Sequence, residues 1–333
     1  TPQEAQELFA TLMSMAKEGH AVIFISHKLE EVMSATSNVT VLRAGRVVST
    51  VETNKTSKEE LAKMMVGREV LFRLEKAAVK TGEVVLKVEN LHALRDNGLP
   101  ALKGVSFSVR EGEILGIAGV AGNGQSELAE VMTGLRRATD GRAYISGKDV
   151  TNLSSKRIIE HGVGHIPEDR INQGLIMDFT VTESAILDTH HMAPFSRGAL
   201  LNFPEINSHV ETLIKNFDVR CPSGKVLTKQ LSGGNLQKLI LAREISRDPK
   251  LLIAVNATTG LDVGATEYVH KKLEEQRERG KSILLISEDL DELIKLCDQL
   301  AVMYEGRIVG IVSAKEIDID KIGLMMTGAR RAE

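Results

Sequence analysis

The chain has 333 residues, which is long enough for two domains. Its hydrophobic content of 42% permits a sizeable core, and its net charge of −3 argues against a broad nucleic-acid-binding surface. The two cysteines, Cys221 and Cys297, lie too far apart in sequence for a zinc motif, so we expect a reducing, cytoplasmic compartment. No apolar run approaches the roughly 20 residues of a membrane helix, so we expect any membrane role to depend on a partner.

The first predicted element is an amphipathic helix at the N-terminus rather than a signal peptide. Thr1 can cap this helix, Pro2 suits its first turn, and Glu4 completes a capping-box spacing. The apolar run Ala21–Ile25 then predicts a buried parallel strand. A helix, a hairpin around Gly45–Arg46 and a closing helix are expected to follow.

Residues 19–51 recur as residues 280–312 with a constant offset of 261 and no gap. The alignment pairs Gly19 with Gly280, Ser26 with Ser287 and Glu31 with Glu292. A match of this length predicts two copies of one kind of domain.

The repeat also predicts the domain organisation. Thr1 aligns with Asp262, so residues 1–70 are expected to be the C-terminal part of a first, truncated copy. Residues 71–83 are expected to form a short polar linker, and residues 84–333 a complete second copy. Strands of the truncated copy would lack neighbours, which predicts open edges and either local disorder or homodimerisation.

The second copy opens with alternating apolar and polar residues over 84–112, which predicts antiparallel sheet. A buried strand, Ile114–Ala118, leads into a glycine loop and then a helix beginning at Ser126. This loop has the spacing of a phosphate-binding loop, but Gln125 stands where the lysine should be. Its backbone N–H groups should attract phosphate oxygens whatever side chain follows. The alternative is a glycine-rich turn without a ligand.

Two further segments follow in order along the chain. "KQLSGGNLQKLILARE" at 229–244 predicts a helix that opens at Ser232 and presents bare N–H groups. Leu251–Val255 predicts a buried strand that ends in a polar turn. The pair His190–His191 and the charged run 271–281 are interpreted as solvated surface.

Taken in order, the phosphate loop, L-S-G-G, the strand ending in T-T-G-L-D and the later strand ending in serine resemble the nucleotide-binding subunits of ABC transporters. The stretches at 164–176 and 261–270 look like the tandem-domain ATPases of importers for simple sugars and purine nucleosides. The resemblance implies an α/β P-loop ABC-type nucleotide-binding domain. It would combine a mixed sheet, an antiparallel β subdomain and a helical subdomain at about 170–240, preceded by the C-terminal part of a second copy.

The resemblance also implies site residues. The degenerate phosphate loop would comprise Gly119, Gly122, Asn123, Gly124, Gln125, Ser126 and Glu127, with Ser126 as the candidate Mg²⁺ ligand. The signature would comprise Leu231, Ser232, Gly233, Gly234, Asn235 and Gln237. Asp262 would lie at the contact between domains, and His27 would be the switch histidine of the first copy's site. For adenine stacking, His92 is the one ring available near 92–98.

Five positions of the second copy depart from an active ATPase. Gln125 stands where the family has its phosphate-binding lysine, and Val255 stands where it has the aspartate that binds Mg²⁺. Asn256 stands in place of the glutamate that polarises the attacking water, and Glu288 in place of the switch histidine. Glu168 stands where the family usually has a glutamine. A charge-assisted hydrogen bond is worth roughly 1.5–3 kcal/mol, so losing the lysine should weaken phosphate binding about ten- to a hundredfold. We therefore expect no ATP hydrolysis at this site.

In such importers, the signature of one domain closes over ATP bound to the other. By this resemblance, Ser232–Asn235 and His27 would serve the competent site of the first domain, and this chain alone would be inactive. Transmembrane permease subunits are the expected partners, with an extracytoplasmic solute-binding protein involved indirectly, at the cytoplasmic face of the membrane. Met177, Phe179 and Ile186 are interpreted either as a groove for a permease helix or as this subdomain's own core.

Two other classes of function stay open at this stage. One is a soluble, non-transport ABC protein that acts as a nucleotide-gated interaction module, for instance on ribosomes. The other is an ATP-independent scaffold. The solute is not specified by these residues, although the segments at 165–170 and 261–270 lean weakly toward nucleosides.

Overall fold

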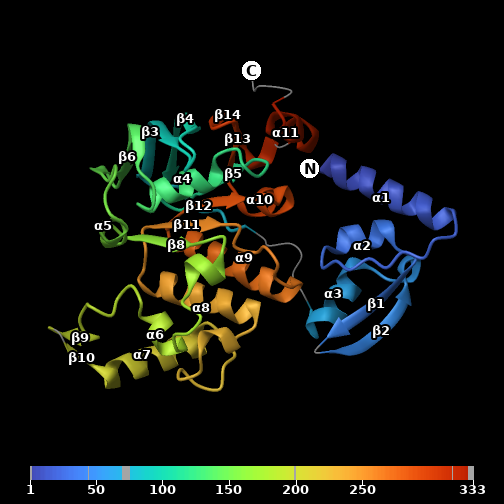
Figure 1. Cartoon of the computed structure of the whole chain (residues 1–333), viewed down its shortest axis with the longest axis horizontal. Coiled ribbons are helices and arrows are strands. Elements are labelled where there is room, and N and C mark those ends of the chain that lie inside the picture. Colours follow the sequence, from blue (N-terminus) through green and yellow to red (C-terminus); the bar gives the residue numbers. More distant parts are fainter. Residues whose placement is uncertain (1, 44, 70–75, 199, 317, 329–333) are drawn as a thin grey trace. The chain divides into compact units, whose positions relative to one another are not determined.

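The structure is a computed structural model that describes residues 2–43, 45–69, 76–198, 200–316 and 318–328. The chain divides into two compact units (Figure 1). The first comprises residues 1–75 with 261–271, and the second comprises residues 76–260 with 272–333. The predicted cap at Thr1 and residues 71–75 of the predicted linker lie outside the described residues.

The first unit contains helices packed on a small hairpin. Its elements are α1 (Pro2–Lys17), α2 (Leu29–Ala35), β1 (Asn38–Arg43), β2 (Arg46–Glu52), the 3₁₀ turn η1 (Thr53–Lys55) and α3 (Lys58–Val66). Strands β1 and β2 pair antiparallel. Leu29, Val41, Leu61 and Ala62 form a small buried cluster between helices and hairpin.

The prediction of a buried strand at Ala21–Ile25 is wrong. This segment has no ladder partner among the described residues, and Ile23 and Ile25 are each 92% exposed. A parallel strand obtains its backbone hydrogen bonds from neighbouring strands, and in the described part of this unit the sheet consists of β1 and β2 alone. The equivalent run in the second unit is β12 (Ser282–Ser287), which is buried between β5 and β11.

Other elements recur at the 261-residue offset. Strands β13 (Gln299–Tyr304) and β14 (Arg307–Ser313) have the bounds of β1 and β2 plus 261, and the register shift lies at the same place. A serine-to-glutamate hydrogen bond also recurs. Ser26 Oγ donates to Glu31 at 2.8 Å, and Ser287 Oγ donates to Glu292 at 2.6 Å. Equivalent side chains therefore make equivalent local contacts in both units.

The second unit is built on a six-stranded mixed sheet in the order β14-β13-β5-β12-β11-β8. Besides β12, β13 and β14, its strands are β5 (Ile114–Ala118), β8 (Val163–Ile166) and β11 (Leu251–Val255). All neighbours are parallel except the edge strand β14. Strands β5, β11 and β12 are buried along their whole length, as expected of β-branched and apolar runs covered on both faces.

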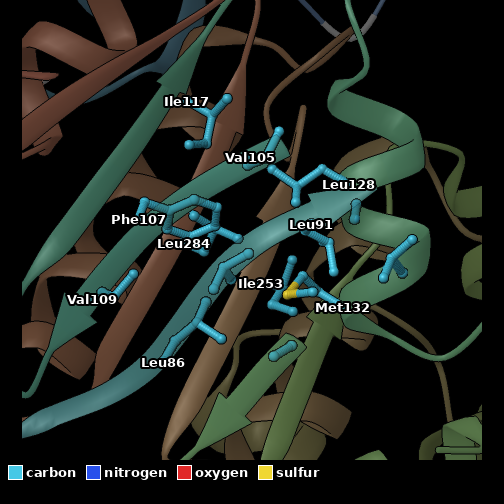
Figure 2. Close-up of a cluster of buried hydrophobic side chains, with 14 of the residues drawn as sticks. Leu86, Leu91, Val105, Phe107, Val109, Ile117, Leu128, Met132, Ile253 and Leu284 are labelled. Atoms are coloured by element: carbon cyan, nitrogen blue, oxygen red, sulfur yellow. The ribbon is translucent and has the colours of Figure 1, made fainter. Parts of the chain in front are cut away.

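An antiparallel sheet in the order β4-β3-β6-β7 covers one side of this mixed sheet. Its strands are β3 (Val84–Leu94), β4 (Pro100–Arg110), β6 (Ala138–Ile145) and β7 (Lys148–Asp149). Helix α4 (Gln125–Met132) lies between the two sheets (Figure 1). Figure 2 shows the resulting core, in which Leu128 and Met132 of α4 meet side chains of both sheets.

Helices gather on the other side of the mixed sheet (Figure 1). They include η2 (Arg170–Gly174, a π-helical turn), α6 (Val181–Ala185), α7 (Phe203–Asn216), η3 (Thr228–Gln230) and α8 (Gly233–Ser246), with the small hairpin β9 (Ser196–Arg197) and β10 (Leu200–Leu201). The remaining elements are α5 (Ser155–Glu160), α9 (Val263–Glu278), α10 (Leu290–Leu296), η4 (Ala314–Glu316) and α11 (Ile319–Met326). The predicted mixed sheet, antiparallel β subdomain and helical subdomain are all present in the second unit.

The charged run 271–281 is partly buried, which corrects its interpretation as solvated surface. Arg277 is 5% exposed and forms ion pairs with Glu274 and Asp298, both at 2.8 Å. Its guanidinium also donates to the carbonyl of Ala77 at 3.1 Å. A residue of the predicted linker is thus held on the second unit. Within the described ranges, no helix combines the length and apolar character needed to cross a bilayer.

Candidate functional site

Four neighbouring parallel strands end at one edge of the mixed sheet. The glycine loop follows β5, Glu288 follows β12, Asn256 follows β11, and Glu168 comes two residues after β8. Carboxyl ends of adjacent parallel strands are where open α/β sheets bind their ligands. The sheet order therefore places these sequence-predicted positions along one edge.

The glycine loop is held from outside by the β13–β14 turn. The backbone N–H of Glu305 donates to Asn123 Oδ1, and that of Gly306 to the Asn123 carbonyl, each at 2.8 Å. Gly122 and Gly124 both have positive φ angles, 85° and 113°. At Gly124 a Cβ would approach the Ala101 carbonyl to 2.9 Å, so glycine is required there both by conformation and by space.

Gln125 closes the loop on itself. Its side chain is 7% exposed, and Nε2 donates to the carbonyl of Val120 at 3.1 Å. Its Oε1 is buried and finds no partner among the described residues. An added Cβ at Gly119 would meet this amide at 2.4 Å, so loop and amide are in close contact. A neutral amide thus occupies the interior of the loop where a cation was expected from the motif.

Ser126 and Glu127, which follow Gln125, do not share its buried position inside the loop. Ser126 is exposed in the first turn of α4. Glu127 forms an ion pair with Arg95 at 3.4 Å, and Arg95 also donates to the Gly122 carbonyl. Arg95 was missed by sequence reasoning because it lies in the β3–β4 turn, outside the motif. His92, the candidate adenine contact, is partly buried with Nε2 3.3 Å from Asn90 Oδ1.

Asn256 connects two of the substituted positions. Its Nδ2 donates to Glu168 Oε1 at 3.0 Å, and its Oδ1 accepts from the backbone N–H of Glu288 at 3.1 Å. Asn256 itself is 8% exposed and has a φ of 43°, while Val255 before it is 4% exposed. A carboxamide cannot take up a proton as a carboxylate base does. The Asn256 carboxamide therefore joins three strand ends through its hydrogen bonds to the Glu168 carboxylate and the Glu288 backbone.

The predicted signature divides into exposed and buried residues. Ser232 is the N-cap of α8, and its Oγ accepts from Asn235 Nδ2 at 3.0 Å. Asn235 Oδ1 in turn accepts from the backbone N–H of Arg220 at 2.9 Å. Leu231 and Gln237 are 9% and 2% exposed, so they pack inside the unit. Ser232 and Gly233 are exposed, with Gly234 partly buried behind them.

Arg170 is a second residue that sequence reasoning missed. Its guanidinium donates to the Thr259 carbonyl in the turn after β11, and its Nη1 is buried without a partner among the described residues. That Nη1 lies 3.9 Å from where a Cβ on Gly233 would be. Arg170 thus ties the segment after Glu168 to the turn after β11 and lies beside the N-terminus of α8. The arginine of the E-D-R triplet was the available signal.

Two predicted residues belong to the first unit. His27 is exposed just after the extended segment 21–25. Asp262 accepts a hydrogen bond at Oδ1 from the backbone N–H of Ala265 at 2.8 Å, so it caps the start of α9.

A buried ion cluster lies behind the site, between β8 and α8. Glu244 pairs with Arg243 at 2.8 Å and with Arg247, and accepts from the backbone N–H of His165 at 3.1 Å. Although burial opposes it, attraction to these two arginines lowers the pKa of Glu244 to about 2. Burial lowers the pKa of His165 to about 4. Asp188 contacts Arg243 at 3.4 Å, and burial raises its pKa.

Comparison with known proteins identifies the family of the domain that carries this site. The model of the family described as "ABC transporter" matches residues 102–259. This range contains the glycine loop, the signature and the strand-end positions Glu168 and Asn256. Residues 102–259 form an ABC transporter domain. The predicted family is thereby confirmed, and domains of this family bind nucleotide, in general with Mg²⁺.

Two curated relatives extend the similarity beyond this domain. The chain is 44% identical over 328 residues to "Nucleoside import ATP-binding protein NupA" of Lactococcus lactis, covering 98% of this chain and 65% of the relative. It is 47% identical over 330 residues to "Glucose import ATP-binding protein TsgD13" of Haloferax volcanii, covering 98% of this chain and 60% of the relative. The chain thus spans less than two thirds of the length of these relatives.

Solved ABC structures share the fold. The structure of cbiO1 from Clostridium perfringens, described as part of the ABC transporter complex cbiONQ, matches with a TM-score of 0.59 and 28% identity. The match covers 75% of this chain and 96% of that one.

Proposed function

We propose that this chain is part of the ATP-binding subunit of an ABC importer for nucleosides or simple sugars. The observation that carries this proposal is the 44% and 47% identity, over nearly the whole chain, to ATP-binding proteins named for nucleoside and glucose import. ATP hydrolysis coupled to transport is then the activity of the whole subunit.

Within that subunit, the two nucleotide sites would do different work. The site at Gln125 lacks a phosphate-contacting cation at position 125 and a carboxylate base at position 256, because neutral amides occupy both positions. It would bind MgATP weakly and leave it unhydrolysed. The N-terminus of α8, which is exposed at Ser232 and Gly233, would instead stabilise the phosphates of a competent site, which His27 would also serve.

The first unit would be the C-terminal part of another ABC domain. Support comes from the elements that recur at an offset of 261 and from the shared Ser–Glu hydrogen bond. Asp262 would lie at the contact between the two domains. The exposed Ile23 and Ile25 would be covered by neighbouring strands in such a domain, or by a second copy of this chain.

Transmembrane permease subunits would contact the second unit beyond Glu168. Ile186 is 5% exposed and belongs to the core, whereas Phe179 is 36% exposed. A cavity of about 340 Å³ lies between α5 and the segment after α6, lined by Lys156, Ile159, Glu160, Leu187, Asp188, His190, His191 and Met192. Its apolar walls and charged rim suit a partner's amphipathic helix. The chain would then be peripheral at the cytoplasmic face, with a solute-binding protein acting through the permease.

Co-expression with the transmembrane subunits of a nucleoside or sugar ABC importer from the same organism tests the proposal. The native chain should co-purify with the permease from detergent, and Met192→Asp should reduce recovery roughly tenfold by placing a charge in an apolar contact. Leu135→Asp is the matched control, because Leu135 is 63% exposed and lies outside this cavity. Co-purification with ribosomes in place of the permease would reject the importer and favour the non-transport class.

A further inference from the structure

The glycine loop can cradle phosphates with its backbone, but it lacks a side chain for a third phosphate. At Gly124 a Cβ would come within 2.9 Å of the Ala101 carbonyl, so glycine keeps the cradle open. Backbone N–H groups of such a loop hold the first two phosphates of a nucleotide, and a lysine reaches the third. The side chain at that position is Gln125, whose Nε2 already donates to the Val120 carbonyl at 3.1 Å. Its Oε1 is buried without a partner among the described residues, and an acceptor does not attract phosphate.

The loop is held on one side and open on the other. The turn between β13 and β14 holds Asn123 through the backbone N–H groups of Glu305 and Gly306, each at 2.8 Å. In the mixed sheet, β13 borders β5 on one side, and β12 borders it on the other, followed by β11 and β8. A phosphate chain longer than the loop can hold therefore extends over the ends of β12 and β11.

The two sides of the loop differ in charge. Residues of both signs lie around the side that is held, among them Arg95, Lys103, Glu127 and Glu305. The segments that follow β8, β11 and β12 are residues 167–171, 256–260 and 288–292, and together they contain six acidic residues and one base, Arg170. The guanidinium of Arg170 is bound to the carbonyl of Thr259. The open side is therefore acidic.

Two of these acidic residues, Glu168 and Glu288, are brought together and have no counter-ion. Asn256 Nδ2 donates to Glu168 Oε1 at 3.0 Å, and Asn256 Oδ1 accepts from the backbone N–H of Glu288 at 3.1 Å. Both glutamates are exposed, and neither forms an ion pair among the described residues. Asp169 and Asp289, by contrast, cap η2 and α10. Two carboxylates thus stand where a third phosphate would extend, and like charges repel.

We propose that the loop site of the second unit selects a nucleoside diphosphate, because Glu168 and Glu288 repel the third phosphate of a triphosphate. This selection rests on the proposed function, since the diphosphate would occupy the second nucleotide site of that subunit. The opposite arrangement, in which Mg²⁺ joins the two carboxylates to a triphosphate, would reverse the preference. Within the described residues, no group of three or more histidine, cysteine, aspartate or glutamate side chains is placed to hold a metal ion.

Nucleotide affinities of the 333-residue chain test the proposal. ADP and ATP would each displace a fluorescent ADP analogue, first in EDTA and then with Mg²⁺, at matched ionic strength. In EDTA we expect ADP to bind about tenfold more tightly than ATP, because each exposed carboxylate should lower the affinity for a third phosphate about threefold. With Mg²⁺ the preference should be smaller and of the same direction. Added salt should also reduce it, since salt screens exposed charges.

Variants without the charge identify the residues responsible. Glu288→Gln should raise the affinity for ATP about threefold and leave that for ADP unchanged. Glu168→Gln should do the same, because a glutamine oxygen can still accept from Asn256, and the double variant should bind both nucleotides about equally. Glu211→Gln is the matched control, because Glu211 is exposed on α7, away from the strand ends. Gly124→Ala should weaken both nucleotides, which would locate binding at the loop.

Four outcomes would overturn the proposal. They are equal or tighter binding of ATP in EDTA, an equal gain for both nucleotides in the glutamate variants, no nucleotide binding by a chain with its native circular dichroism spectrum, and a preference for ATP that appears with Mg²⁺. The last would assign the two carboxylates to a metal ion. Each of these results is obtained without a permease, so the importer proposal stands or fails separately in the co-purification experiment.

Discussion

Position 125 combines the backbone of a phosphate loop with an uncharged side chain. The Gln125 amide donates to Val120 within the loop, so the loop keeps an internal hydrogen bond without a cation. Phosphate would still meet backbone N–H groups at the start of α4. What is absent is the charge-assisted contact, and that contact accounts for much of the affinity of such loops.

Gln125→Lys should therefore raise affinity for MgATP about ten- to a hundredfold, since one charge-assisted hydrogen bond is worth roughly 1.5–3 kcal/mol. Titration with a fluorescent ATP analogue would measure this. Gln125→Met is the control, being similar in length and uncharged, and should give no gain. Tight MgATP binding by the native chain would show that the lysine is dispensable here.

The buried ion cluster predicts a pH dependence for the second unit. The pKa of His165 falls from 6.5 to about 4 on folding, so between these values the unfolded chain binds a proton that the folded chain does not. Stability should thus fall as pH drops from about 6.5 to about 4 and change no further from this group below that. Because part of His165 stays accessible, about 3 kcal/mol is an upper bound.

Urea unfolding followed by circular dichroism would test this, since the chain has no tryptophan. His165→Asn should flatten the dependence between about pH 6.5 and about pH 4.5. The contribution of Glu244 separates from it, because a carboxylate whose pKa is lowered to about 2 loses its stabilisation only below its unfolded value of 4.5. An unchanged slope in His165→Asn would assign the effect to other groups.

At the scale of elements, the repeat offers a matched pair of apolar segments. Residues 21–25 are extended without partners, while β12 is buried between two parallel strands. The same kind of apolar run therefore meets two different environments. Whether such a run forms a strand therefore depends on the presence of adjacent strands and not on its own residues.

Ile25→Ala should cost less than about 0.5 kcal/mol of unfolding free energy, as for exposed positions. Its counterpart Ile286→Ala should cost about 2–5 kcal/mol, because Ile286 is 2% exposed and its loss leaves a cavity. Denaturant unfolding measures both. Hydrogen exchange should also be fast across 21–25 and slow across 282–287, and uniformly slow exchange over 1–70 would contradict this account.

At the scale of the molecule, the proposed function divides the site residues of this chain between two nucleotide sites with unequal chemistry. Gln125 in the loop and Asn256 after β11 stand where the family resemblance implies a cation and a base, and the N-terminus of α8 is exposed at Ser232 and Gly233. The relatives it matches are longer than this chain.

The purified chain should therefore show no ATP turnover above background in a phosphate-release assay. Gly234→Asp, which would place a negative charge at the N-terminus of α8, serves to identify signature-dependent turnover. Activity in the native chain that Gly234→Asp abolishes would mean that the chain completes a working site, for instance through a homodimer.

Much of the second unit could be predicted from local patterns. The predicted bounds of β5 and β11 are identical to those observed, because both are short apolar runs with clear turn signals on each side. The loop and the helix after Ser232 were predicted from motifs whose geometry is local. The ABC transporter domain follows from their order.

Strand pairing and side-chain burial depend on contacts between residues far apart in the sequence, which local patterns do not show. Ala21–Ile25 looks like a strand, but a strand exists through hydrogen bonds to partners elsewhere in the chain, and none pairs with it in the described residues. Arg277 looks solvated, but Asp298 and Ala77 surround its guanidinium from distant positions. The residue types and their spacing along the chain determine the order of the elements. They also show that Gln125 and Asn256 stand where the family has charged residues. Burial, pairing and the Glu168–Asn256–Glu288 link arise from residues that meet only on folding, so the tertiary structure alone decides them.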